Sequence, residues 1–440
     1  MKRFVAFCVR MLGSILIPAL LLLFPVPSKA QLVVDCTGAT PGAFPLISSA
    51  ISSSGLGTAI FVVAGPCNED LQIFGATDLF IGTYTEQPNV ALNGRISIAD
   101  SHGVYFHGLN ISSSSGSGIT ASSTRAIILD TCTSNNNAGF GLTLSGASEA
   151  LIISPASFDG NASGGLNLSE SSTVEMTSWG GQAIDISNNR GPGVYASFGS
   201  FNTYGHTNIL NNSAGQGSLS GYGIDLRGGS RAQLGAITAP NVISGNQSGG
   251  ISLQETAELS LWNGGSQSYV QNNGPVGISV GFGSQVTLFN DVEVSGHTGP
   301  ALDLYANSQG YLFGANYLHN NGTSTDPRSA AIRVDGNSQV FLRGGTVSQN
   351  YGPAILALVN SSADLTGVSF AANTGGIISC DTSAYMVSDL IVGPLPSSGV
   401  LCRTPHNLGN RVFNKLAPVA PDWSALKALQ AKYTKMATRK

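Results

Sequence analysis

The sequence predicts an all-β solenoid in which eleven or more short coils stack along one axis. A small residue, an aliphatic residue and then alternating apolar and polar positions recur at intervals of 22 to 30 residues. Only 10% of the 440 residues are charged, and 56 are glycine. Exposed helices need charged faces and nucleic-acid binding needs a basic surface, so this composition argues against a helical protein and against a nucleic-acid partner.

The first thirty residues have the pattern of a secretory signal peptide. Lys2 and Arg3 precede an apolar run, Met11–Phe24, and small residues before Gln31 offer a cleavage site. A membrane anchor is the weaker alternative, because the run has 14 residues and a spanning helix needs about 20. We therefore expect residues 1–30 to be removed, the mature protein to be extracellular or periplasmic, and no membrane span to remain.

Each coil of the repeat begins at an aliphatic anchor residue. Apolar side chains at the anchor and two, eight and ten residues after it alternate within short runs, as in strands with one buried face. The position ten residues after the anchor is apolar or aromatic in all eleven coils, with Tyr204 and Val387 among them. The anchors are Ile119, Leu142, Leu166, Val194, Ile224, Ile251, Ile278, Leu302, Ile332, Ile355 and Ile377.

Two polar positions recur in register with the anchors and predict hydrogen-bonded ladders along the stack. Serine stands six residues after the anchor in nine of eleven coils, with Ser148, Ser172, Ser200 and Ser230 as the first four. Asparagine stands five residues before the next anchor at Asn137, Asn161, Asn189, Asn246, Asn273 and Asn350. His297 occupies the asparagine position in its coil, so we interpret it as a turn residue rather than a catalytic one.

This pattern resembles that of the right-handed parallel β-helix proteins of the pectate-lyase-like superfamily. The resemblance covers about residues 45–390. Phe44 to Ile51 is similar to their short capping helix, Ile60 to Gly65 to a first strand and turn, and Val104 to Ile111 to a later coil. The resemblance implies one β-helix domain over residues 31–393, which we expect to be monomeric, but this scaffold carries many functions.

Five cysteines remain after signal cleavage, and export permits disulfide bonds. The pairs Cys36–Cys67 and Cys380–Cys402 are plausible because each lies at one end of the chain, where the scaffold needs closing. Cys132 is then the odd cysteine, and we interpret it as a small buried residue.

The repeat stops after residue 393, and residues 394–440 form a proline-rich segment that ends in a predicted helix. Asp422 can cap this helix. Trp423, Leu426, Leu429, Tyr433 and Met436 form one apolar stripe, and basic residues lie elsewhere. The helix either caps an open coil end or packs on the acidic body; alternatively, it offers a basic amphipathic surface to an anionic partner.

Candidate catalytic residues lie at outward positions of neighbouring strands, which is where the resemblance places chemistry. Asp303, Arg333 and Asp335, together with Tyr305, cluster on one face of two adjacent coils. Two carboxylates and a fixed cation can act in acid–base catalysis or hold an anionic sugar. Alternatively, these residues form a surface ion pair that contributes little to stability. Asp225 lies three coils away, roughly 14 Å, too far to be the second carboxylate of a glycoside hydrolase.

Outward aromatic residues follow one another on successive coils. Trp262, Phe289 and Phe313 share one column, and Tyr311 and Phe341 stand beside them. Such a patch is too large to stay uncovered without a reason. It either stacks on sugar rings, with Tyr305 nearby, or is covered by Trp423 or Leu426 of the C-terminal segment.

These observations leave two hypotheses of different classes. The first is a secreted protein that binds or processes a polysaccharide, with a lyase-like or glycoside hydrolase-like activity if it is an enzyme. The second is a non-catalytic surface, adhesion or structural solenoid. The sequence has neither the aspartate cluster of a calcium site nor the spacing of a zinc site, so we expect no metal and no cofactor.

Overall fold

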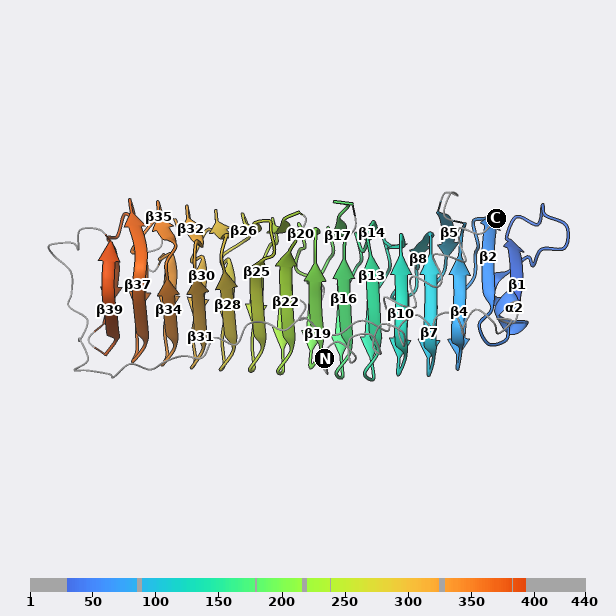
Figure 1. The fold of residues 1–440 in the computed structure, drawn as a ribbon, viewed down its shortest axis with the longest axis horizontal. Coiled ribbons are helices and arrows are strands. Elements are labelled where there is room, and N and C mark those ends of the chain that lie inside the picture. Colours follow the sequence, from blue (N-terminus) through green and yellow to red (C-terminus); the bar gives the residue numbers. More distant parts are fainter. Residues whose placement is uncertain are drawn as a thin grey trace, which may run out of the picture.

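The computed structural model describes residues 30–84, 89–178, 180–215, 220–237, 239–323, 329–381 and 383–392, the last strand by its backbone alone. Its strands wind into a right-handed parallel β-helix of about 13 turns (Figure 1). The predicted fold class is confirmed. Two coils precede the first predicted anchor, because Leu71 pairs with Ile96 and Ile96 with Ile119.

The described strands form a 13-stranded sheet and a 26-stranded sheet, and the larger sheet consists of two rows. β37 joins the rows because it pairs with both β34 and β35. The 13-stranded sheet contains β3 (Leu71–Phe74), β6 (Ile96–Ala99), β9 (Ile119–Ser122), β12 (Phe140–Ser145), β15 (Gly164–Ser169), β18 (Val194–Ser197), β21 (Tyr222–Arg227), β24 (Gly249–Leu253), β27 (Ile278–Val280), β30 (Leu302–Leu304), β33 (Ile332–Val334), β36 (Ile355–Ala357) and β38 (Ile378–Cys380).

Row 1 of the 26-stranded sheet contains β1 (Gln31–Asp35), β2 (Ala59–Ala64), β4 (Thr77–Gly82), β7 (His102–His107), β10 (Arg125–Asp130), β13 (Glu149–Ile153), β16 (Thr173–Thr177), β19 (Ser200–Tyr204), β22 (Arg231–Ala236), β25 (Glu258–Asn263), β28 (Gln285–Phe289), β31 (Gln309–Phe313), β34 (Gln339–Arg343), β37 (Ser362–Ala371) and β39 (Tyr385–Val392). Row 2 contains β5 (Val90–Asn93), β8 (Leu109–Ser112), β11 (Thr133–Ser134), β14 (Ala156–Ser157), β17 (Ile184–Ser187), β20 (Thr207–Leu210), β23 (Asn241–Ser244), β26 (Ser268–Gln271), β29 (Val292–Ser295), β32 (Tyr317–His319) and β35 (Thr346–Ser348).

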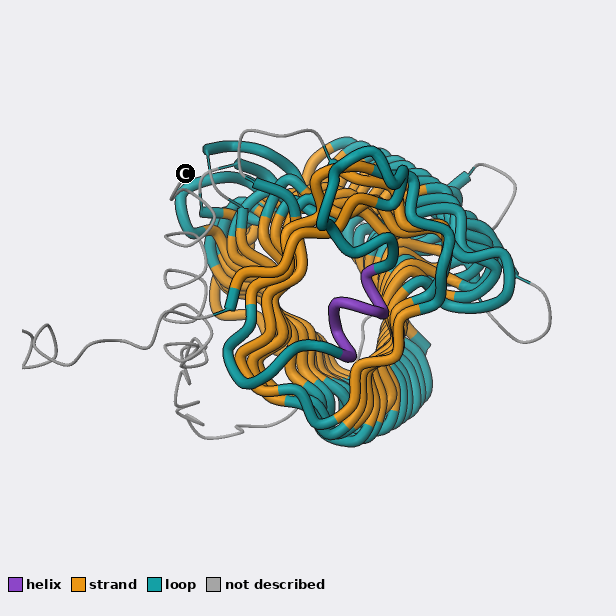
Figure 2. Tube along the Cα trace, turned by 90° about the vertical axis from the view of Figure 1, so that its right-hand side faces the viewer, coloured by secondary structure: helices purple, strands orange, loops and turns teal. Residues whose placement is uncertain are grey.

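The coils enclose one continuous core. Side chains alternate between the inside and the outside of the wall, so Ile127 and Leu129 of β10 enter the core while Ile128 points away from it. Viewed along the axis, the coils lie over one another around a single interior (Figure 2). Each coil therefore buries its apolar residues against its neighbours, and the domain is one long stack.

The asparagine ladder is confirmed and is longer than predicted. The side-chain amides of Asn189, Asn212 and Asn246 each donate to the carbonyl oxygen of the next asparagine at 2.8 to 2.9 Å. The ladder also includes Asn212, Asn321 and Asn373, which variable loop lengths hide in the sequence. His297 fills a gap, because its Nδ1 accepts the Asn273 amide at 3.2 Å. Burial lowers the pKa of His297 to about 4, which fits the predicted turn role.

Four predicted register positions are wrong by one residue. The last coil begins at Ile378 rather than Ile377, because Ile355 pairs with Ile378, and Leu365 pairs with Ser388 rather than Val387. The inward-facing Met176 pairs with Thr203 rather than with Tyr204, so Thr203 faces the core and Tyr204 points outward. In the same coil Gly199 replaces Ser200 in the serine ladder, and its amide donates to the Ser230 hydroxyl at 3.1 Å. Each error follows from one residue more or less in a turn.

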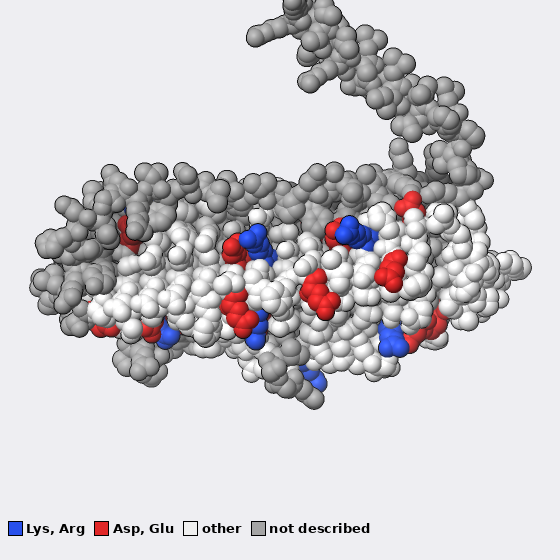
Figure 3. Space-filling model, turned by 90° about the horizontal axis from the view of Figure 1, so that it is seen from below, with Lys and Arg blue, Asp and Glu red and all other residues white. Residues whose placement is uncertain are grey.

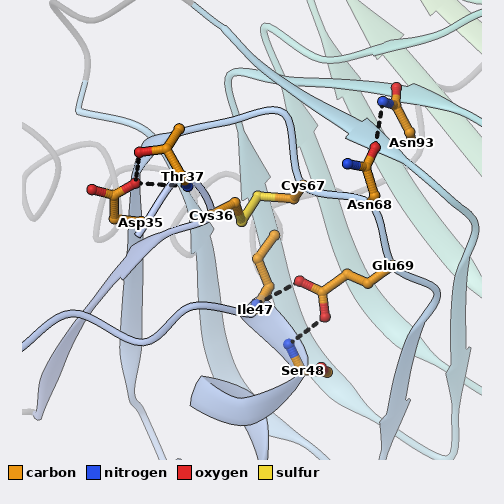
Figure 4. The surroundings of a disulfide bond; sticks show 9 residues. All are labelled: Asp35, Cys36, Thr37, Ile47, Ser48, Cys67, Asn68, Glu69 and Asn93. Carbon is orange, nitrogen blue, oxygen red and sulfur yellow. Dashed lines mark hydrogen bonds between the residues drawn. A yellow bond between two sulfur atoms is a disulfide. The ribbon is translucent and has the colours of Figure 1, made fainter. Parts of the chain in front are cut away.

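The N-terminal end of the stack is closed by a strand, a helix and a disulfide (Figure 4). β1 precedes the predicted first strand and pairs with β2. The capping helix is α2 (Ile47–Ser52), which buries Ile47 and Ala50. The Glu69 carboxylate accepts the amide protons of Ile47 and Ser48 at 2.6 and 2.9 Å, and the predicted Cys36–Cys67 bond is confirmed.

Of the three other cysteines expected in the mature protein, the structure describes Cys132 and Cys380. Cys132 is free and buried, as predicted, and burial raises the pKa of its thiol to about 12. Cys380 is disulfide-bonded, but Cys402 lies outside the described residues, as do the predicted signal segment 1–29 and the C-terminal segment with Trp423 and Leu426. Within the described ranges, no helix has the length and hydrophobicity that crossing a bilayer requires.

Candidate functional site

The predicted pair of Asp303 and Arg333 lies on the outer face of the 13-stranded sheet. Asp303 of β30 and Arg333 of β33 are register partners on adjacent coils. Asp303 Oδ1 and Arg333 Nε are 2.9 Å apart, but the contact is not aligned as a hydrogen bond. The interaction is therefore an ion pair that leaves the guanidinium free to donate elsewhere.

The pKa of the Asp303 carboxyl is shifted. Shifted pKa values are common among groups that exchange protons with a substrate. Burial raises the pKa of its carboxyl above the ordinary range. The nearby Arg333 opposes this shift and the negative charge of Asp335 adds to it. Of the predicted carboxylates, Asp303 is thus the one suited to donate and accept a proton.

A second acid–arginine pair lies on the same face. Arg227 of β21 donates to both carboxylate oxygens of Asp225, from Nε at 3.2 Å and from Nη2 at 2.9 Å. Ser220 also donates to Asp225, at 3.0 Å. The hydrogen bond with Asp225 raises the pKa of Arg227, so this guanidinium is a fixed cation.

Small residues connect the two pairs along one register column. Asp225 pairs with Ser252, Ser252 with Ser279, and Ser279 with Asp303. Asp225 and Asp303 are therefore three coils apart, as the sequence predicted. The two serines between them are small and buried, and they form the floor between the two pairs.

Two tyrosines lean over glycines at the sides of this floor. A Cβ on Gly249 would lie 2.5 Å from Tyr222 Cε1, and one on Gly281 would lie 2.4 Å from Tyr305 Cζ. A larger residue at either glycine would displace the ring. The hydroxyl of Tyr305 also accepts a hydrogen bond from Gln254 Nε2 at 3.1 Å.

Electrostatics shows that these groups form one cluster. Burial, followed by the charges of Asp225 and Asp303 and the Tyr305 hydroxyl, raises the pKa of Tyr222 to about 12. We call these residues the serine-floor cluster: Tyr222, Asp225, Arg227, Ser252, Gln254, Ser279, Asp303, Tyr305 and Arg333. The sequence prediction missed Tyr222 and Gln254, although glycines at 249 and 281, across the coils from aromatic residues, were an available signal.

The predicted aromatic residues lie on a different face. Trp262, Phe289 and Phe313 are register partners in row 1, on β25, β28 and β31. Their rings and those beside them stack on one another, with centroids 5.4 Å apart for Phe289 and Phe313 and 5.0 Å for Tyr311 and Phe341. The structure thus places Asp303 and Tyr305 on one sheet and the aromatic column on the other.

The cluster stands out because charge is sparse elsewhere. Figure 3 shows acidic and basic side chains as separate patches on a largely uncharged side of the molecule. In both pairs of the cluster the cation is the more exposed partner: Arg227 is 38% exposed against 2% for Asp225, and Arg333 is 29% against 16% for Asp303. The face therefore presents two guanidinium groups.

Comparison with known proteins agrees with this architecture. Residues 94–273 match the family model described as a right handed beta helix region. The fold of the described chain is a right-handed parallel β-helix. The predicted resemblance is confirmed at the level of the fold. No curated protein matches this β-helix protein.

Three solved structures that the comparison matched share little sequence with this chain. The A-module of the Azotobacter vinelandii mannuronan C-5 epimerase AlgE4 is 13% identical, with a TM-score of 0.40 over 81% of this chain and 94% of that one. The A-module of AlgE6 from the same organism is 14% identical, with a TM-score of 0.43 over 79% and 93%. The receptor-binding tailspike of bacteriophage Det7 is 11% identical, with a TM-score of 0.33 over 88% and 78%.

Proposed function

We propose that this β-helix protein binds an acidic polysaccharide across the serine-floor cluster. The observation that carries the proposal is the pair of partly exposed guanidinium groups, Arg227 and Arg333, each held by a more deeply buried carboxylate. Guanidinium groups match the planar geometry of carboxylate and sulfate groups. Because the supporting acids are less exposed than the arginines, the guanidinium groups are the more accessible charged groups of each pair.

The arrangement of the cluster supports an extended ligand. Asp225 and Asp303 are separated by Ser252 and Ser279 on intermediate coils. Arg227 and Arg333 lie on strands four coils apart, or roughly 19 Å. Tyr222 and Tyr305 offer ring faces and hydroxyl groups along this floor. A chain with repeated acidic groups can contact both arginines at once, whereas a single small anion contacts one.

A processing step, if it accompanies binding, is assigned to Asp303. Its carboxyl has a pKa above the ordinary range, chiefly because it is buried, and such a group can hold a proton for transfer to a bound sugar. Arg333 lies beside it to stabilise the charge that remains. Asp335 is then a positioning residue that acts on Asp303 through its charge.

The proposed site of action is outside the cell. The Cys36–Cys67 disulfide closes the N-terminal end of the stack, and such bonds persist in oxidising compartments. The basic and apolar start of the sequence supports the same assignment.

The test is a binding assay against a polyuronate, a sulfated glycan and a neutral glucan. We expect the acidic glycans to bind, and Arg227→Gln and Arg333→Gln each to weaken binding about tenfold or more, because a hydrogen bond to a charged group contributes about 1.5–3 kcal/mol. Arg231→Gln is the matched control, since that arginine pairs with Glu258 on row 1. Equal binding by all three variants would exclude the cluster as the site.

Turnover is measured separately from binding. Release of reducing ends or unsaturated products by the wild-type protein, and its loss in Asp303→Asn with binding retained, is the expected result for a processing enzyme. The Asp303→Asn change keeps the size of the side chain and removes its titrating proton.

The second candidate is a non-catalytic structural solenoid. The observation in its favour is that the outward aromatic rings of row 1 stack on one another, which uses ring faces that a sugar would otherwise contact. This candidate requires that none of the three glycans binds and that no product is released.

A further inference from the structure

The outer face of row 1 is buried along its N-terminal coils. Within β2 to β13, strands of this row send alternate side chains into two separate apolar clusters, one inside the coil and one outside it. The outer residues Ala59, Phe80, Tyr105, Ile128, Leu151 and Glu175 form one register column. None of the six is more than 1% exposed.

Such burial requires a second layer, because the outside of a one-layer wall faces solvent. Outward residues of the 13-stranded sheet in the same part of the molecule, such as Thr120 and Thr143, are only partly buried. Tyr84 covers one end of the outer cluster by stacking on Phe61, with centroids 4.5 Å apart. The rest of the column needs a longer covering segment.

We propose that residues 422–440 cover this face as an amphipathic helix, along row 1 from β2 to β16. The proposal is independent of the polysaccharide proposed for the other face. The described chain ends at Val392 in β39, in the last coil, so the covering segment must return along the whole stack.

The length of the remaining chain fits this path. The 13 coils span roughly 62 Å at the strand spacing of about 4.8 Å. The 29 residues 393–421 reach up to about 95 Å when extended. A helix of the 19 residues 422–440 is about 28 Å long, close to the roughly 24 Å between the first and the last residue of the six-residue column.

The chemistry of the segment also fits the face. Trp423, Leu426, Leu429, Tyr433 and Met436 form its apolar stripe. The outer face is largely apolar from Phe80 to Leu151, and its acids include the partly buried Asp130 and the buried Glu175. Residues 411–440 contain seven basic residues and one acid, which complements them. The apolar run at 11–24 is a poorer occupant, because we expect it to be removed on export.

The first test uses cysteine pairs in the full chain. Leu151→Cys is combined in turn with Leu426→Cys, Leu429→Cys and Tyr433→Cys, and the matched control replaces Leu151 by Thr143→Cys on the 13-stranded sheet. We expect at least one Leu151 pair to form an intramolecular disulfide on a non-reducing gel and no Thr143 pair to do so. Disulfides only between chains would show that a second copy covers the face and would overturn the proposal.

The second test changes the segment itself. Removal of residues 422–440, or Leu429→Asp in the full chain, should increase binding of a hydrophobic dye at least severalfold and speed amide exchange in β7, β10 and β13. Ala431→Asp, on the opposite side of the predicted helix, is the control and should leave both unchanged. A synthetic 422–440 peptide should restore the protection. Unchanged dye binding and exchange in both the truncated protein and Leu429→Asp would overturn the proposal.

Discussion

The two outer faces of the same wall follow different rules. Outward positions of the 13-stranded sheet are mostly polar, and in its later coils they include the serine-floor cluster of paired charges and tyrosines. Outward positions of row 1 are apolar and buried through the first coils and become stacked aromatic rings further along. The repeat that builds the core leaves outward positions free to vary, so one face can bind ligand and the other can be covered.

The largest predicted difference between the two faces is in the free energy of unfolding when an aspartate is introduced on one face or the other of the same coil. Leu151→Asp should lower the free energy of unfolding by about 3–5 kcal/mol, because it removes buried apolar contacts and buries a charge. Thr143→Asp should change it by less than about 1 kcal/mol, because that position is partly solvated. Urea denaturation of both variants measures the contrast. Similar losses would mean that the faces are equally covered.

The second prediction compares arginines that pair with acids on the two faces. Arg227→Ala should lower the free energy of unfolding by about 1–3 kcal/mol, because it leaves the buried Asp225 carboxylate without its main partner. Arg231→Ala should cost about 0–0.5 kcal/mol, because the Arg231–Glu258 pair is 70% and 53% exposed. Thermal and urea unfolding provide the values. An equal cost would show that the Asp225 pair is as solvated as the other.

The third prediction concerns the glycines beneath aromatic rings. In row 1, a Cβ on Gly235 would lie 2.4 Å from Trp262 Cζ2, so Gly235→Ala should cost about 1–2 kcal/mol by overpacking and shift the tryptophan fluorescence. Gly281→Ala should cost about 0.5–1 kcal/mol, since Tyr305 can swing outward at the loss of one hydrogen bond. The Gly281 variant should instead weaken glycan binding. A larger stability loss at Gly281 than at Gly235 would reverse the comparison.

The smallest predicted effect is a difference in how the stability contributed by Asp130 and by Asp303 depends on pH. Burial favours a raised pKa at Asp130, but His107, 3.4 Å away, and the Tyr105 hydroxyl hold that pKa below its ordinary value. Its stabilising contribution is therefore present above the ordinary carboxyl range and is lost as the pH falls through its lowered pKa. Asp303 has a raised pKa, so its contribution is present at low pH and is lost as the pH rises through that value.

Asparagine substitutions at the two aspartates test these opposite signs. Between about pH 3 and pH 7, the stability of the wild type relative to Asp130→Asn should increase, whereas that relative to Asp303→Asn should decrease. Urea denaturation across the range gives both curves. Slopes of the same sign would contradict the assignment of opposite environments to the two carboxylates.

Much of the serine-floor cluster was predictable, and the missing members have a common cause. The register of Asp225, Asp303 and Arg333 follows from counting residues after each anchor, because parallel coils repeat at fixed offsets. Tyr222 lies outside the counted positions, and Gln254 stands at one of them, three residues after Ile251. Both were missed because their side chains make contacts across coils, which counting positions within one coil does not show. The one-residue errors at Tyr204 and Ile377 arose where a turn changed length without changing its composition.

The sequence by itself determined the stacked coils, the ladders and which residues face inward. These depend on alternation and on short fixed turns, which are local properties of the chain. Only the tertiary structure decided which outward side chains contact one another across coils, as Gln254 and Tyr305 do, and which outward residues are buried, as Leu151 is. The reason is physical: contacts between coils depend on loop lengths summed over many residues, and burial of an outer face depends on a second layer that no repeat position specifies.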